Sequence, residues 1–314
     1  MNEREFIESL RALARDPAAR GLVDDVAVLT LGDRCLVLTQ DMIVEGVHYL
    51  PGDPPEDVAW KLVAVNLSDL AAKGARPLGV LLGFTLIGEE SWNRAFVSGL
   101  GEALNAFAIP LLGGDTVSAP EGAPRSLGMT ALGEAPAPVP SRAGARPGDQ
   151  LWVSGTIGDA GAGLEALRAG RDAPALVERY RTPRPRLEAG QKLAPMVSAM
   201  MDVSDGLLID ALRLAHASEA AIALDLAQLP LSAAYLEARG GAREARIAAA
   251  TAGDDYELLF TAPADRGAEI ARLGETLEIS LSRIGLVESG RGLRLSDGAE
   301  RVPLPASLGW EHRA

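Results

Sequence analysis

Cysteine is nearly absent, since the 314-residue sequence holds a single one, Cys35. One thiol excludes an intrachain disulfide, a zinc site built from several cysteines and an iron–sulfur cluster bound through cysteines. A chain without disulfides suits a reducing compartment, so we expect a cytoplasmic protein.

Long apolar runs and an excess of positive charge are also missing. An uncharged stretch at an apolar peak, residues 77–88, is far shorter than the roughly 20 residues that cross a bilayer. The first residues include acidic side chains and lack the apolar core of a signal peptide. With 43 acidic and 30 basic residues, the formal net charge is −13. Because nucleic acid and anionic lipid both need a cationic partner, we expect neither nucleic-acid binding nor membrane association.

Several catalytic motifs are missing as well. Only three basic residues are lysines, and none precedes Ser or Thr, so the sequence has no phosphate-binding P-loop. The three histidines never form His-Glu-x-x-His, which excludes a zincin-type metalloprotease. The glycine cluster at 155–163 does not match Gly-x-Gly-x-x-Gly, and Gly-x-Ser-x-Gly does not occur. These absences disfavour a dinucleotide-binding fold and an α/β-hydrolase.

The apolar pattern alternates between strand spacing and helix spacing, which predicts a mixed α/β (α+β) fold. Segment 134–149 concentrates four prolines and two glycines, as a connection between domains does. We therefore expect an N-terminal domain at 1–140 and a C-terminal domain at 141–314. The expected strands are 26–31, 35–39, 78–87, 109–112, 150–154, 199–203, 222–226, 256–262 and a final hairpin. The expected helices are a short N-terminal one and 56–73, 92–107, 160–169, 207–217, 231–239 and 266–273.

Aspartates recur directly after apolar runs, where α/β folds place ligands. They are Asp24, Asp25, Asp41, Asp69, Asp115, Asp202, Asp205, Asp254 and Asp255. Carboxylates that converge on one site repel one another, so such a group predicts a hard divalent cation, Mg²⁺ above all, shared with phosphate oxygens.

Each signal also has a purely structural interpretation. Ser204 and Asp205 could cap the helix that follows them. Asp69 could belong to an exposed, salt-bridged helix face with Asn66 and Lys73. The stretch 113–115 could form a tight turn instead of an approach to phosphate. A surface histidine and a packed tryptophan are the corresponding alternatives for His48 and Trp310.

These residues lie in a series of segments that runs along nearly the whole chain. The segments are DDVAVL (24–29), TQDMIVEGVHY (39–49), AVNLSDLAAKGARP (64–77), GGDTV (113–117), SRAGARPGD (141–149), VSGTIGDAGAGL (153–164), DVSDGL (202–207), GDDYELLF (253–260) and GWEH (309–312). The series resembles the thiamine-monophosphate kinase family within the AIR synthase-like (PurM-like) superfamily.

The resemblance implies a PurM-like two-domain fold. In it the N-terminal mixed sheet forms a barrel across a homodimer, and ATP binds between that domain and a C-terminal α/β domain. The implied reaction is direct, Mg²⁺-assisted transfer of a phosphoryl group from ATP to thiamine monophosphate, which yields thiamine diphosphate in the last step of its biosynthesis. Several Mg²⁺ ions are implied, and a monovalent cation is a further candidate.

The resemblance also implies a role for individual residues. The metal ligands would be Asp25, Thr39, Gln40, Asp41, Asp69, Asp115, Asp202 and Asp205. The ATP contacts would be Gly114, Asp115, Arg142 and Ser204, and the thiamine monophosphate contacts would be His48, Asp254 and Trp310. Gln40 stands where the family usually has Thr or Ser, and Asp254 where Glu is common. No general base is implied, because a phosphate monoester is largely dianionic at neutral pH.

Two other functions remain open at this point. One is another ATP-dependent synthase of the same superfamily, acting on an amide or a selenium species. Cys35 lies inside an expected strand, whereas a selenophosphate-type enzyme would carry a reactive cysteine or selenocysteine in a mobile N-terminal segment. The other is a non-catalytic protein that binds metal or nucleotide, which only an assay distinguishes from an enzyme.

Overall fold

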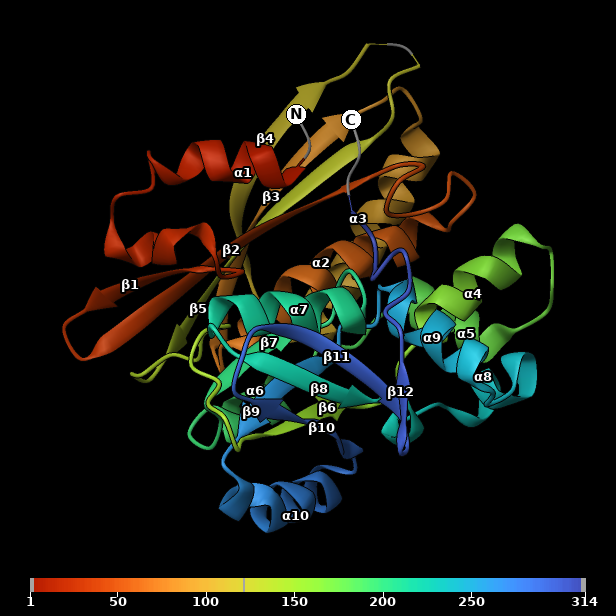
Figure 1. Ribbon diagram of the computed structural model, residues 1–314. Coiled ribbons are helices and arrows are strands. Elements are labelled where there is room, and N and C mark those ends of the chain that lie inside the picture. Colours follow the sequence, from red (N-terminus) through yellow and green to blue (C-terminus); the bar gives the residue numbers. More distant parts are fainter. Residues whose placement is uncertain (1–2, 121, 312–314) are drawn as a thin grey trace.

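A computed structural model describes residues 3–120 and 122–311 of the chain, and its elements form two mixed sheets with helices around them (Figure 1). The first sheet contains β1 (Ala27–Leu31), β2 (Arg34–Val44), β3 (Arg76–Leu86), β4 (Leu111–Ser118) and β5 (Ser126–Ala135). The helices of this half are α1 (Glu3–Arg11), the 3₁₀ helix η1 (Pro17–Leu22), α2 (Pro55–Ala72) and α3 (Glu90–Ala106).

The first sheet has the strand order β1-β2-β5-β3-β4. β3 and β4 pair in parallel, and the other neighbours are antiparallel. The expected hairpin is confirmed, with Leu31 opposite Arg34 across a two-residue turn. The expected helices at 56–73 and 92–107 are confirmed as α2 and α3.

Two parts of the first sheet differ from the sequence expectation. β5 was not expected, because three of its five buried residues are alanine or glycine, which gives the strand little apolar contrast. The GGDT segment continues as part of β4, so the tight-turn interpretation of 113–115 is wrong. A Cβ atom on Gly114 would lie 1.9 Å from the carbonyl oxygen of Leu82, so this close approach of β3 and β4 requires glycine.

The second sheet has the order β12-β11-β8-β10-β6-β9-β7, and only β8 and β11 pair in parallel. Its strands are β6 (Gln150–Ser154), β7 (Ala199–Asp202), β8 (Ala221–Asp225), β9 (Leu258–Ala262), β10 (Leu281–Glu288), β11 (Gly292–Asp297) and β12 (Glu300–Val302). Its helices are α4 (Asp159–Arg168), α5 (Pro174–Arg181), α6 (Leu187–Leu193), α7 (Leu207–Ala217), α8 (Ala233–Arg239), α9 (Arg243–Ala252) and α10 (Gly267–Leu277), with the 3₁₀ helices η2 (Leu226–Gln228) and η3 (Ala264–Arg266).

Most expected elements of this half are confirmed, although three helices were not expected. The helix expected at 231–239 begins at Ala233, because the Ser232 hydroxyl accepts a hydrogen bond from the Tyr235 backbone N–H and caps it. The missed helices are α5, α6 and α9. The first two are short and separated by a proline-rich stretch, and α9 buries mainly alanine.

Helix α2 lies at the centre of the molecule, between the two sheets (Figure 1). It packs against β2, β5 and α3 of its own half and against α6 and β7 of the other. Fourteen of its 18 residues are consequently buried, including polar ones. Asp69 is among them, so the interpretation of this helix as an exposed salt-bridged surface is wrong.

Among residues 3–120 and 122–311, no helix is both long enough and apolar enough to cross a bilayer.

Candidate functional site

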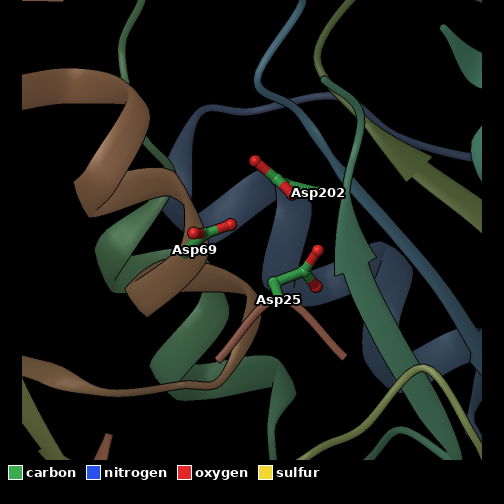
Figure 2. Close-up of side chains that lie close together, drawn as sticks. All are labelled: Asp25, Asp69 and Asp202. Carbon is green, nitrogen blue, oxygen red and sulfur yellow. The ribbon is translucent and has the colours of Figure 1, made fainter. Parts of the chain in front are cut away.

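Three buried or half-buried carboxylates meet where α2 faces the second sheet. Asp25 precedes β1, Asp69 lies in α2 and Asp202 ends β7, and one oxygen of each lies within 4.8 Å of the others. Figure 2 shows the three side chains pointing toward one another. Residues from both halves of the chain therefore build one acidic cluster.

Hydroxyl groups from neighbouring residues hold two of these carboxylates in place. The Ser68 hydroxyl donates to Asp202 Oδ2 at 2.6 Å, which joins α2 to β7. The Thr39 hydroxyl donates to Asp69 and is 3.3 Å from the Asp25 carbonyl oxygen. Thr39 reaches them because alternate side chains of β2 face α2.

Two cations bind Asp25. Arg142 donates to it from both Nη2 and Nε, the latter at 3.2 Å, and Lys73 Nζ lies 3.1 Å away. Lys73, which is fully buried, also donates to Asp24 Oδ1 at 2.5 Å and to the Met200 carbonyl at 3.2 Å. Burial acts to raise the pKa of Asp25, but the charges of Arg142 and Lys73 outweigh it and hold the pKa well below its usual value.

The other two carboxyl groups of the cluster, and that of the nearby Asp41, have the opposite pKa shift. Burial, together with the charge of Asp25, raises the pKa of Asp202 to about 8. Burial and the neighbouring Asp41 and Asp202 raise the pKa of Asp69 well above its usual value. Burial and the charge of Asp25 raise the pKa of Asp41 to about 6. The site therefore has more carboxylate than its basic residues neutralise, and its all-oxygen ligands fit a hard divalent cation such as Mg²⁺.

The loop between β7 and α7 carries Ser204 and Asp205. The backbone N–H groups of both donate to Asp210 Oδ2, at 3.1 and 3.2 Å. Arg213 in turn binds Asp205 and Asp210, at 2.5 and 2.8 Å. The residue that caps α7 is Gly206, so Ser204 and Asp205 are not the helix cap. Asp210 and Arg213 instead fix a loop that begins beside the acidic cluster, at Asp202.

The strand register separates the remaining predicted metal ligands into two groups. The Asp41 backbone N–H donates to Asn66 Oδ1 at 2.9 Å, on the α2 side of the sheet. Gln40 is exposed on the other side, where its side chain accepts a hydrogen bond from Thr130 at 3.2 Å. Asp115 is also exposed. It lies opposite Gly83, and this strand register places its side chain on the same side of the sheet as that of Gln40. One chain by itself does not bring Asp115 to the cluster.

The predicted thiamine monophosphate contacts lie around the same loop and around α2. Asp254 has φ +64°, and its backbone N–H donates to the Ser204 carbonyl at 2.7 Å. The Trp310 backbone N–H donates to the Asp205 carbonyl at 2.8 Å, and 52% of its surface is exposed. His48 Nδ1 accepts from the Val44 backbone N–H at 3.0 Å. Lys61 connects the His48 carbonyl and the Asp254 carboxylate, at 3.0 and 2.8 Å.

A cavity of about 340 Å³ opens beside the acidic cluster and is lined by Asp24, Asp25, Thr39 and Gln40 among others. It provides space for a small ligand next to Asp25.

Several residues of the site were not identified from the sequence. Ser68, Lys61, Asp210 and Arg213 all orient a predicted site residue. The available signal was spacing, because Lys61 lies within the apolar helix α2 and Lys73 follows its last residue, one helical turn after Asp69.

Comparison with known proteins identifies the family of this chain. The model of the AIR synthase related protein N-terminal domain matches residues 23–135, and that of the C-terminal domain matches residues 146–298. Fold and site thus define a two-domain AIR synthase related protein. The thiamine-monophosphate kinase of Caulobacter vibrioides is 40% identical over 96% of this chain and 88% of its own. This chain belongs to the thiamine-monophosphate kinase family.

Solved structures are similar over almost the whole chain. AaThiL complexed with AMPPCP and TMP has a TM-score of 0.87 and 31% identity, with 99% of this chain and 97% of that one covered. The thiamine-monophosphate kinase from Stenotrophomonas maltophilia has a TM-score of 0.79 and 38% identity, with 94% and 96% covered. The PurM-like two-domain α/β fold implied by the sequence is thereby confirmed.

Proposed function

We propose that this chain transfers the terminal phosphoryl group of ATP to thiamine monophosphate and so forms thiamine diphosphate. The buried cluster of Asp25, Asp69 and Asp202 is the observation that supports this most directly. An acidic site can bind two phosphorylated substrates only if cations offset the charge. Membership of the thiamine-monophosphate kinase family then favours this reaction over that of another ATP-dependent synthase.

We assign the metal ions to the carboxylates of both halves. Asp25, Asp41, Asp69, Asp202 and Asp205 would hold Mg²⁺ with the Thr39 hydroxyl. Gln40 would contribute its backbone carbonyl, because its side chain binds Thr130 on the other side of the sheet. When bound there, Mg²⁺ would offset the negative charge gathered between the reacting groups. A monovalent cation is a further candidate for the same acidic surroundings.

The protein's own residues then have to bind and align two anions. Arg142 would contact the nucleotide phosphates from its position beside Asp25, and Ser204 would contact them from the loop before α7. His48, Asp254 and Trp310 would hold thiamine monophosphate, with the exposed indole of Trp310 stacking on a heterocycle. A general base is unnecessary because the acceptor phosphate is already largely dianionic.

We further propose a cytoplasmic homodimer that uses the exposed side of the first sheet. Met42, Leu81 and Val117 project from this side and are each at least 39% exposed. A second copy docked there would cover this apolar surface. It would also bring Gly114 and Asp115 of one chain toward the metal and ATP site of the other, which a single chain does not achieve.

The decisive assay measures ADP release with MgATP and thiamine monophosphate, beside thiamine, an amide acceptor and no acceptor. We expect ADP only with thiamine monophosphate, and none with EDTA. Asp69→Asn should lower kcat/KM on the order of 100-fold or more, because it removes a metal ligand. Asp33→Asn, an exposed turn residue, is the matched control. Turnover with the amide acceptor instead would favour a related synthase.

A further inference from the structure

Lys61 is a buried cation outside the acidic cluster. It lies in α2, and only 2% of its surface is exposed. Its ammonium group donates to the His48 carbonyl oxygen at 3.0 Å and to Asp254 Oδ2 at 2.8 Å. It also lies 4.1 Å from the centre of the Tyr180 ring. These partners surround the ammonium, so Lys61 cannot itself be an exposed binding group for a ligand.

The partners of Lys61 come from three separate segments. His48 belongs to the connection between β2 and α2, Tyr180 to α5, and Asp254 to the connection between α9 and β9. Tyr180 also donates to Asp53 Oδ2 at 3.3 Å, and Asp53 accepts from the Leu50 backbone N–H at 2.8 Å. The β2–α2 connection is therefore fixed at two points by the same set of contacts.

Asp254 depends on Lys61 for its orientation. Its backbone is in the left-handed region, with φ +64°, which aspartate adopts more readily than most non-glycine residues. Tyr256 donates to Asp254 Oδ1 at 3.1 Å while Lys61 binds Oδ2. The side chain nevertheless remains 28% exposed, so part of the carboxylate is accessible to a ligand.

We propose that Lys61 is a positioning residue of the thiamine monophosphate site, where its ammonium fixes the distance between the His48 segment and the Asp254 carboxylate. This inference rests on the proposed function. Lys61 acts on thiamine monophosphate through two residues from opposite halves of the chain. The hydrogen bonds that Lys61 donates to His48 and Asp254 involve neither Arg142 nor Ser204, which we assigned to ATP.

The test compares Lys61→Met with the wild type, using Lys192→Met, an exposed lysine on α6, as the matched control. Steady-state kinetics should show KM for thiamine monophosphate raised roughly tenfold or more, with KM for ATP within about twofold of wild type. Calorimetric titration with thiamine monophosphate should show the same loss of affinity. The control should match the wild type in both measurements.

A double-mutant cycle with Asp254→Asn shows whether Lys61 acts through Asp254. We expect the double variant to be hardly worse than Asp254→Asn alone, because the second change removes an interaction already lost. If Lys61→Met does not fold, Lys61→Gln is judged by the same measurements. A folded variant with unchanged thiamine monophosphate affinity, or with equal losses for both substrates, would overturn the inference. Failure of the wild type to phosphorylate thiamine monophosphate would instead overturn the proposed function.

Discussion

Asp202 shows how burial acts on one carboxyl group of the acidic cluster. Burial and the charge of Asp25 raise its pKa to about 8, against a value near 4 for an exposed aspartate. Between these two values the folded chain holds a proton that the unfolded chain has released. The metal-free protein must therefore lose stability as the pH rises through this range. Asp41, with a pKa of about 6, adds to the loss in the lower part of the range.

We expect the melting temperature of the metal-free protein, measured in EDTA, to fall by several degrees between about pH 6 and about pH 8.5. Asp202→Asn, which keeps an acceptor for the Ser68 hydroxyl, should make the fall smaller. Adding Mg²⁺ should reduce it as well, because the metal offsets the ionised carboxylates. Asp33→Asn serves as the control. An equal fall of the melting temperature with pH in Asp202→Asn and in the wild type would contradict this explanation.

Some site residues are predictable from the sequence, and others are not. The aspartates at 25, 69 and 202 lie in motifs whose composition already indicates a metal site. The groups that hold them cannot be read from the motifs, because Ser68 and Lys73 reach their partners only through tertiary packing. The roles of Gln40 and Asp115 depend on which side of the sheet their side chains occupy. Side chains alternate between the two sides, but the side that faces α2 is known only once the strand pairing is known.

Helix α3 crosses α2 at Gly99, a residue without a side chain. A Cβ atom on Gly99 of α3 would lie 2.4 Å from Glu56 Cα and 2.6 Å from the Glu56 carbonyl oxygen. The two helices approach this closely only because Gly99 has no side chain. Gly101, in the same helix, faces open space.

These two glycines should respond in opposite ways to alanine. Gly99→Ala should destabilise the fold by about 1–3 kcal/mol, because the helices must move apart. Gly101→Ala should be neutral or stabilise by up to about 1 kcal/mol, because alanine favours the helix. Denaturant unfolding of both variants measures the difference. Similar effects at the two positions would show that the crossing is looser than described.

The elements missed from the sequence share one physical property. β5 and α9 bury mostly small side chains, so their apolar periodicity is weak. The helix α6 has only seven residues, and it buries Ala189, Gly190 and Leu193 by packing against α2. A segment of that length gains little from intrinsic helix propensity. Tertiary contacts determine its conformation, and these cannot be read from local sequence.

At the scale of the whole molecule, the two halves are joined through the site. The pairs Ser68–Asp202, Lys73–Met200, Arg142–Asp25 and Lys61–Asp254 each connect one half to the other. From the composition we expected neither nucleic acid nor a membrane as a partner. The composition contains no information on the contacts between the two halves or on the proposed second subunit. Both arise only when distant segments are brought together.

The proposed dimer predicts a mass of twice 32.8 kDa in light scattering. Introducing lysine at both Met42 and Val117 should shift the protein toward the monomer, because charge would be buried between the two sheets. Val97→Lys, at an exposed apolar position on α3, is the control and should leave the mass unchanged. A wild-type protein that is monomeric at micromolar concentration would refute this arrangement.

The burial of α2 on every side also has an evolutionary consequence. Most helices of a globular protein have a solvent-facing side on which substitutions accumulate at little cost. α2 offers almost no such side, since one side packs on the first sheet, another on α3 and a third on the second half of the chain. Neutral drift in this protein must therefore be concentrated elsewhere, and a change in α2 requires compensating changes in both halves at once.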